Sequence, residues 1–308
     1  MFYWFYRHLE VNIFQYITVR AGIAFFIAFL LTMILLPKFV KWAKSKNASQ
    51  PIYEYAPASH QEKAGTPTMG GVVFIACTII ATLLTAKLSN YYVAGALLLI
   101  ALFSLIGIKD DWSKISKNKN SAGLSARMKL VLQVSASIIV VYILYIYSHS
   151  TTLFIPFNKN PLLDMGLYSI AFWIIVMVAA SNAVNMTDGL DGLATVPSIM
   201  AFFSLSTIVY ITGHAIISGY LLLPNIKFVG ELAIVGAAMI GSLIAFLWYN
   251  SHPAEVFMGD SGSLPIGAFM GYMAIVAKSE LLLIIIGFIF VIETVSVILQ
   301  VGSFKLRQ

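Results

Sequence analysis

Residues 91–114 read YYVAGALLLIALFSLIGIKDDWSK. The stretch is almost entirely apolar up to Ile108, and a lysine and two aspartates follow directly. An apolar run of this length is typical of a helix that crosses a membrane, which needs roughly 20 such residues. The abrupt change predicts that Lys109, Asp110 and Asp111 lie at a membrane boundary.

The whole chain has the composition of a membrane protein. Of its 308 residues, 59% are hydrophobic and 10% are charged, and the mean hydropathy is +0.88. A soluble domain cannot bury that much apolar surface, so we predict an all-α polytopic membrane bundle, with residues 1–308 forming one integral membrane domain. The net charge of +6 is explained by basic cytoplasmic loops, and we expect no nucleic acid partner.

Nine apolar runs predict nine membrane spans. They lie at Val19–Leu36, Met69–Ala86, Tyr91–Ile108, Leu130–Tyr147, Leu167–Asn185, Leu193–Thr212, Gly230–Tyr249, Leu264–Ala277 and Leu281–Val301. Lysine and arginine concentrate in the loops after the first and third spans, whereas the alternate loops hold few charges. Because basic loops stay in the cytoplasm, these two loops are predicted to be cytoplasmic and the N-terminus to lie outside.

The predicted cytoplasmic face also gathers acidic residues from three connections. Asp110 and Asp111 would end the third span at a helix C-terminus, where the helix dipole disfavours negative charge. Two adjacent carboxylates would also repel each other, by about 3 kcal/mol at about 5 Å and an effective dielectric near 20. A cation would relieve both effects, and Mg²⁺ commonly uses one or two carboxylates together with substrate phosphates. For this pair alone, a solvated helix end neutralised by lysine explains the pattern equally well.

Residues 182–193, NAVNMTDGLDGL, form the second acidic connection. Two Asp-Gly steps predict that the helix breaks here, and irregular backbone at membrane depth is tolerated where it is buried or lines an aqueous cavity. Asn185, Asp188 and Asp191 are spaced by three residues and can share a face where the backbone is helical. We favour a functional site over an ordinary turn.

Residues 250–263, NSHPAEVFMGDSGS, form the third connection. Gly259 would let the backbone approach a ligand next to Asp260. Ser263 is predicted to cap the following span, whose free N–H groups favour phosphate. Phe257 could stack on a base, although packing at the membrane interface is at least as common for a single aromatic side chain.

Residues 60–71, HQEKAGTPTMGG, lead into the second span. Thr68 is predicted as its N-cap, and Lys63 could approach an anion at that helix N-terminus. This motif is weak on its own. Together, carboxylates, lysines and helix N-termini at one lipid boundary indicate a site for Mg²⁺, a phosphorylated substrate and a membrane lipid.

The four motifs together resemble the polyprenyl-phosphate N-acetylhexosamine-1-phosphate transferase superfamily, and within it the phospho-N-acetylmuramoyl-pentapeptide-transferases. The matching segments agree in order and spacing over essentially the whole chain: Lys63 with 65–71, Asp110 with Asp111, 182–193 and 257–263. Gly-Thr-Pro-Thr-Met-Gly-Gly at 65–71 favours this family over relatives that use UDP-N-acetylglucosamine, which remain the alternative.

The resemblance implies a Mg²⁺-dependent enzyme of the bacterial cytoplasmic (inner) membrane, with its active site facing the cytoplasm. Such an enzyme transfers phospho-MurNAc-pentapeptide from UDP-MurNAc-pentapeptide to undecaprenyl phosphate, forming lipid I and UMP in peptidoglycan synthesis. It implies Asp260 as the Mg²⁺ ligand, with Asp110 and Asp111 serving the metal or activation of the lipid phosphate. Residues implied around the nucleotide-sugar or its phosphates are Lys63, Thr68, Lys114, Lys129, Asn185, Asp188, Asp191, Asn250, Phe257, Gly259 and Ser263.

The resemblance also implies ten spans with both termini outside. Nine spans would leave the C-terminus inside, so we expect that a C-terminal loop and a last span are missing and that the chain is not fully active on its own. A homodimer of two copies is a further possible partner arrangement.

A membrane transporter is the alternative from a different class. Carboxylates within a membrane often mark ion pathways, and Glu293 lies in the ninth apolar run. A transporter is expected to show internal repeats and acids at the midplane. Here the acids crowd one face and the sequence shows no repeat, so the enzyme hypothesis is preferred.

Overall fold

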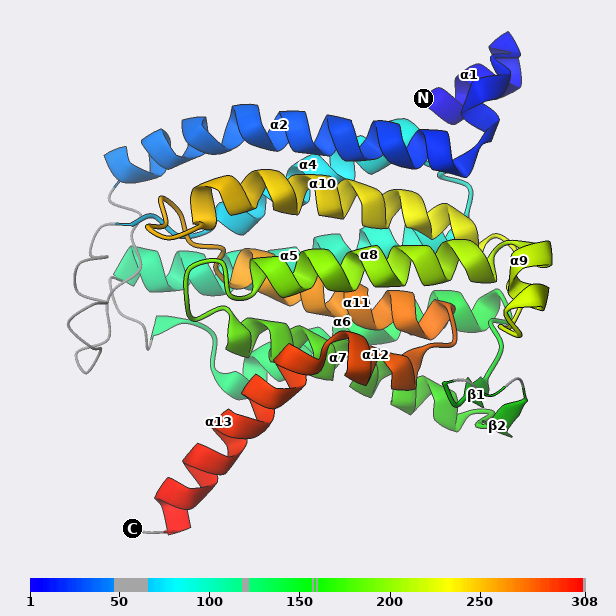
Figure 1. Cartoon of the computed structure of the whole chain (residues 1–308). Coiled ribbons are helices and arrows are strands. Elements are labelled where there is room, and N and C mark those ends of the chain that lie inside the picture. The colour runs from blue at the N-terminus through cyan, green and yellow to red at the C-terminus, as the bar shows by residue number, and fades with distance from the viewer. Residues whose placement is uncertain (47–65, 118–121, 157, 159, 307–308) are drawn as a thin grey trace.

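The computed structural model describes residues 1–46, 66–117, 122–156, 158 and 160–306. Lys63, one of the predicted site residues, lies outside these ranges. The described chain is a bundle of helices with one small hairpin at one end (Figure 1).

The helices are α1 (Phe2–Leu9), α2 (Ile17–Ser45), α4 (Gly70–Thr85), α5 (Tyr91–Lys117), α6 (Ala126–Ile146), α7 (Tyr168–Thr187), α8 (Thr195–Thr212), α9 (Ala215–Tyr220), α10 (Leu232–Asn250), α11 (Asp260–Val276), α12 (Glu280–Ile286) and α13 (Phe288–Leu306). Strands β1 (Thr152–Phe154) and β2 (Pro161–Asp164) pair antiparallel, with Thr152 opposite Asp164. Single-turn 3₁₀ segments at Asn12–Gln15 and Val229–Glu231 precede α2 and α10.

The predicted all-α membrane architecture is confirmed, and each predicted span falls on a helix or helix pair. Among the described residues, six helices are long and apolar enough to cross a membrane, or seven if α12 and α13 count as one bent span. Helix α4 is apolar but shorter, with 16 residues.

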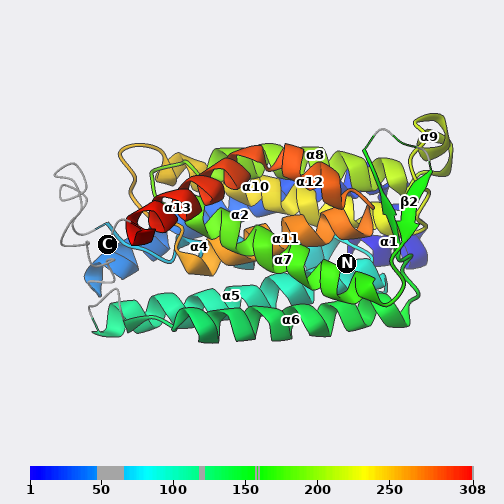
Figure 2. The same ribbon diagram turned by 90° about the horizontal axis from the view of Figure 1, so that it is seen from below.

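Helix α11 forms the centre of the bundle. It contacts α4, α5, α7 and α8, and every residue from Asp260 to Val276 is buried. Figure 2 shows α5 and α6 side by side along one edge, with α7 and α11 next to them. Close approach depends on small residues: a Cβ at Gly267 would lie 2.2 Å from the Ala180 carbonyl oxygen of α7. A helix enclosed by other helices need not be apolar on every side, so α11 can carry Asp260 at its start.

The predicted ninth span, Leu281–Val301, is not a single straight helix. Helices α12 and α13 meet at Gly287 with an angle of 81°, and α13 leaves the bundle (Figure 1). An apolar groove of about 320 Å³ lies between α7 and these two helices. The continuous apolar run conceals this bend, because hydropathy does not record where packing breaks a helix.

Candidate active site

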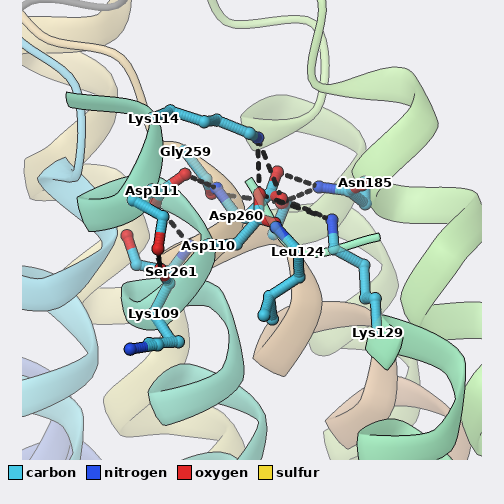
Figure 3. Close-up of polar contacts among 12 residues, drawn as sticks. Lys109, Asp110, Asp111, Lys114, Leu124, Lys129, Asn185, Gly259, Asp260 and Ser261 are labelled. Carbon is cyan, nitrogen blue, oxygen red and sulfur yellow. Dashed lines mark hydrogen bonds and ion pairs between the residues drawn. The ribbon is translucent and has the colours of Figure 1, made fainter. Parts of the chain in front are cut away.

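Four charged side chains from three helices meet at one end of the bundle (Figure 3). Asp110 and Lys114 come from α5, Lys129 from α6 and Asp260 from the first turn of α11. The Nζ of Lys114 lies 2.6 Å from Asp110 Oδ2 and 3.3 Å from Asp260 Oδ2. The Nζ of Lys129 lies 2.5 Å from Asp260 Oδ2 and 3.7 Å from Asp110 Oδ2. The two lysines therefore bridge the two carboxylates.

The remaining oxygens of these carboxylates are also held by the protein. Asp110 Oδ1 accepts a hydrogen bond of 2.7 Å from the backbone N–H of Leu124. Asp260 Oδ1 accepts one of 2.7 Å from Asn185 Nδ2, which also donates to Ser263 Oγ at 2.8 Å. Asn185 thus connects α7 to the start of α11.

Asp111 points in another direction from its neighbour. Its Oδ1 accepts from the backbone N–H of Asp260 at 3.1 Å, and its Oδ2 from that of Ser261 at 2.9 Å. The prediction that Asp110 and Asp111 end the helix is wrong, because α5 continues to Lys117. Successive helical residues are rotated by about 100°, so one aspartate faces the lysines and the other faces α11.

Both predicted helix caps are also wrong. Helix α11 begins at Asp260 with Gly259 as its N-cap, so Ser263 lies inside the first turn, where its Oγ donates to the Gly259 carbonyl at 3.1 Å. Helix α4 has Met69, not Thr68, as its N-cap. Its first N–H groups, those of Gly70 and 71, donate to carbonyls of the 257–258 segment at 2.9 Å. Caps from distant segments replaced the local side chains that the sequence offered.

The 67–71 and 257–258 segments run together beside the cluster. The backbone N–H of Phe257 donates to the Pro67 carbonyl at 2.9 Å. Within the described residues, the buried Thr68 Oγ1 has no hydrogen-bond partner, and it would lie 3.0 Å from a Cβ placed at Gly259. Thr68 is therefore close to Asp260 with its hydroxyl available.

The second acidic motif lies on an adjoining loop. Helix α7 ends at Thr187, which confirms the predicted break, and Asp188 is its C-cap. Asp191 Oδ2 lies 3.1 Å from His252 Nδ1, a residue that sequence reasoning missed. The HisPro step at 252–253 was visible in the sequence, but nothing local identified its partner.

Asn250, the last residue of α10, ties these loops together. Its Oδ1 accepts from the Gly192 backbone N–H at 3.2 Å and from Thr195 Oγ1 at 2.8 Å. Its Nδ2 donates to the Val256 carbonyl at 3.0 Å. The side chain is 3% exposed, so its contacts with the protein position the loops that carry Asp191 and Phe257.

Asp188 lies close to the acidic cluster, and the pKa of its carboxyl group is raised. Burial of the carboxyl group raises its pKa to about 8, and the negative charges of Asp260 and Asp111 add to the effect. The backbone N–H of Gly259 acts in the opposite direction. A protonated Asp188 can donate a hydrogen bond as well as accept one.

This shift predicts a pH-dependent contribution to stability. The unfolded chain releases the Asp188 proton near pH 4, whereas the folded protein holds it to about pH 8. The stabilising contribution is therefore full at low pH and is lost as pH rises across that window. Asp188→Asn cannot ionise, so its Tm relative to the unmodified protein should rise between pH 5 and pH 8. A difference in Tm that is constant across this range would contradict the prediction.

The donor atoms suit a hard divalent cation. Asp110, Asp111 and Asp260 each offer a carboxylate oxygen, and these atoms lie within 4.8 Å of one another. Mg²⁺ takes oxygen ligands and is commonly held by one or two carboxylates plus substrate phosphates. The cations already placed here, Lys114 and Lys129, show that this position favours positive charge.

Comparison with known proteins agrees with this geometry. Residues 93–278 match the glycosyl transferase family 4 model, and residues 63–75 match phospho-N-acetylmuramoyl-pentapeptide-transferase signature 1.

Three relatives carry the name phospho-N-acetylmuramoyl-pentapeptide-transferase. The protein of Aliarcobacter butzleri is 70% identical over 308 residues, which covers 100% of this chain and 87% of the relative. That of Sulfurimonas denitrificans is 60% identical over 309 residues, with 100% and 87% covered. That of Campylobacter jejuni (strain RM1221) is 58% identical over 294 residues, with 95% and 83% covered. The chain belongs to the phospho-N-acetylmuramoyl-pentapeptide-transferase family.

Proposed function

We infer that this chain transfers phospho-MurNAc-pentapeptide from UDP-MurNAc-pentapeptide to undecaprenyl phosphate, forming lipid I and UMP. The observation that carries this assignment is the 70% identity over the whole chain to a relative of that name. The buried cluster of Asp110, Asp111 and Asp260 supplies a site that fits the chemistry.

We propose Mg²⁺ as the cofactor, held through Asp260 and Asp110. When bound, the metal would neutralise negative charge on the pyrophosphate as the leaving group forms. Lys114 and Lys129 lie on the same two carboxylates, so their ammonium groups can reach phosphate oxygens held there. Two fixed cations stabilise charge that develops in the transition state.

The bonds that form and break in the proposed transfer define the role of Asp110. An oxygen of the lipid phosphate attacks the β-phosphorus of the nucleotide-sugar and forms a new P–O bond. The bond from that phosphorus to the bridging oxygen breaks, and its electron pair leaves with UMP. Asp110 is the base that takes the remaining proton of the lipid phosphate when one is present. Its Oδ2 lies at the lysine cluster, where the attacking oxygen would be held.

The adjoining loops are proposed to bind the nucleotide-sugar. Thr68 offers a buried hydroxyl with no hydrogen-bond partner among the described residues, and Asp188 offers a carboxyl group whose pKa is raised by burial. Phe257 is half-buried beside them and can stack on the base. Asn185, Asp191, Asn250, Gly259 and Ser263 complete this part of the proposed site, and the resemblance adds Lys63.

The prenyl chain is proposed to lie in the apolar groove between α7, α12 and α13. The groove is lined by Ala179, Ala183, Ile284 and Val291 among others. Such a surface suits a long hydrocarbon and faces the region that lipid would occupy. The groove and the charged cluster both adjoin α7 and α11.

Filling this groove should weaken lipid binding selectively. Ala179→Trp places a large ring in the groove and is expected to raise the KM for undecaprenyl phosphate about tenfold, equivalent to about 1.4 kcal/mol. The KM for UDP-MurNAc-pentapeptide should not change. Met200→Trp is the matched control, because Met200 is 63% exposed on α8. Equal effects of both substitutions on lipid KM would contradict the proposed groove.

We propose that the charged cluster faces the cytoplasm and that the N-terminus lies outside. Basic residues of α2 and α5 lie near the same end of the bundle as the cluster: Lys41, Lys44, Lys114 and Lys117. Positive charge of this kind is retained on the cytoplasmic side. Labelling of single cysteines at exposed positions of α1 and α5 in intact cells would test the orientation.

The decisive experiment is UMP release by the purified chain in detergent. UDP-MurNAc-pentapeptide and undecaprenyl phosphate would be supplied with Mg²⁺ or with a chelator, and UDP-N-acetylglucosamine would replace the first substrate in a parallel reaction. Release that requires Mg²⁺ and the pentapeptide substrate supports the assignment. Release from UDP-N-acetylglucosamine alone would overturn it in favour of the alternative substrate class.

A further inference from the structure

We propose that Asp111 is a positioning residue: its carboxylate caps the N-terminus of α11 and thereby fixes Asp260, while Asp110 and Asp260 face the metal and the phosphates. This inference rests on the proposed function of the same site. It separates the roles of two adjacent aspartates that the sequence presents as a pair.

The start of α11 needs an external partner. The first N–H groups of a helix have no acceptor within it, and a side chain of the N-cap residue usually supplies one. The N-cap of α11 is Gly259, which has no side chain. The N–H groups of Gly262 and Ser263 donate to the Gly259 carbonyl at 3.0 and 3.1 Å. Those of the first two residues, 260 and 261, are left, and Asp111 of α5 accepts from both.

Glycine at position 259 makes this arrangement possible. Its φ is +73°, a conformation that L side chains rarely adopt. A Cβ there would lie 2.6 Å from Asp111 Oδ2. The carboxylate of Asp111 therefore occupies the space that a conventional capping side chain would take.

One face of α5 is shaped to hold the first turn of α11. Ser104, Gly107 and Asp111 are spaced by three and four residues, so they share a helix face. Ser104 Oγ donates to the Ser261 carbonyl at 3.2 Å. A Cβ at Gly107 would lie 2.1 Å from the Asp260 carbonyl oxygen. The three positions bring α5 against the backbone of Asp260 itself.

The two lysines of the cluster contact Asp110 and Asp260, which indicates that these two acids are the ones that face cations. Lys114 and Lys129 both bridge Asp110 and Asp260. Among the described residues, no ion pair joins either lysine to Asp111. Both Asp111 oxygens are instead engaged by backbone N–H groups, and the side chain is buried.

Hydrogen exchange of the metal-free protein tests the capping role directly. In chelator, Asp111→Asn replaces one acceptor oxygen by an NH₂ group, so protection of the amides of Asp260 and Ser261 should fall about tenfold or more. Asp110→Asn is the matched control and should leave that peptide unchanged. Equal protection of these two amides in Asp111→Asn and in the unmodified protein would overturn the capping role.

A second variant is expected to displace Asp260 without replacing any acidic residue. Gly107→Ala should displace the Asp260 backbone and raise the dissociation constant for Mn²⁺, measured by electron paramagnetic resonance, about tenfold. It should also lower kcat for UMP release, as Asp111→Asn does. Gly22→Ala on α2, where nothing lies within 4 Å of an added Cβ, is the control and should change neither quantity.

The two measurements keep the inference separate from the function on which it rests. Loss of Mn²⁺ binding in Asp111→Asn with unchanged exchange and a neutral Gly107→Ala would assign Asp111 as a ligand and overturn the positioning role. A protein that releases UMP from UDP-N-acetylglucosamine alone would refute the proposed function, whereas the exchange result would still decide whether Asp111 caps α11.

Discussion

Asp260→Asn is expected to lower kcat for UMP release about 10³-fold, at the upper end of the loss seen when one preorganised charge-stabilising group is removed. The amide keeps the shape of the side chain but loses the negative charge proposed to hold Mg²⁺. It also removes the carboxylate partner of Lys129, whose Nζ lies 2.5 Å from Asp260 Oδ2. Initial rates at saturating substrates, followed across a Mg²⁺ titration, would measure the change.

The substitution should leave the fold intact, because Asn can still accept the hydrogen bond from Asn185 that Asp260 Oδ1 accepts. Asp164→Asn is the matched control: Asp164 is exposed on the hairpin at the far end of the bundle and should leave the rate within about twofold. If Asp260→Asn kept a tenth or more of the activity with an unchanged Mg²⁺ dependence of the rate, Asp260 would not be the principal ligand.

The convergence of the acidic motifs could be predicted from the sequence, and the structure shows why. Asp110 and Asp260 each follow or precede an apolar run, and alternate loops of a polytopic protein share a membrane face. Lys114 and Lys129 come from that same face. Hydropathy and charge placement are properties of short segments, so they identify which residues gather at one end of the bundle.

The direction of each side chain could not be predicted in this way. The apolar run ends at Ile108, yet α5 continues to Lys117, because residues beyond a membrane boundary can remain helical and the Asp110–Lys114 pair at i,i+4 supports them. This continuation turns Asp111 toward α11. Likewise, the caps expected at Thr68 and Ser263 were replaced by partners from remote segments, which no local pattern encodes.

The bend at Gly287 also depends on contacts with remote segments, which the local sequence does not encode. A single glycine within an apolar run is tolerated in a straight helix and predicts no break by itself. The angle of 81° between α12 and α13 follows from how α12 packs beside α11 and α13 beside α7. The groove proposed for the prenyl chain is lined by both helices of this bend, so hydropathy alone does not predict it.

Removing one partner of the buried ion pair between Arg20 and Glu231 is expected to destabilise the fold by about 3–5 kcal/mol, because it leaves a buried charge without compensation. The guanidinium of Arg20 on α2 contacts both oxygens of Glu231, at 2.8 and 2.5 Å. Arg20 is 1% exposed. Its Nη1 also donates to the Thr85 carbonyl at 3.4 Å, and the Lys87 backbone N–H donates to Glu231 Oε2 at 3.3 Å. The pair thus joins α2, the end of α4 and the start of α10.

Glu231→Ala should therefore lower the thermal stability in detergent strongly, measured as loss of the folded, monodisperse protein on heating. The double variant Arg20→Met with Glu231→Leu should recover most of that loss, since a buried ion pair replaced by apolar groups of similar volume is often neutral or stabilising. Because the pair lies at the end of the bundle opposite Asp260, UMP release per folded molecule should be unchanged in every variant. A double variant as unstable as Glu231→Ala would show that the hydrogen bonds to Thr85 and Lys87, and not the uncompensated charge, determine the stability of this end of the bundle.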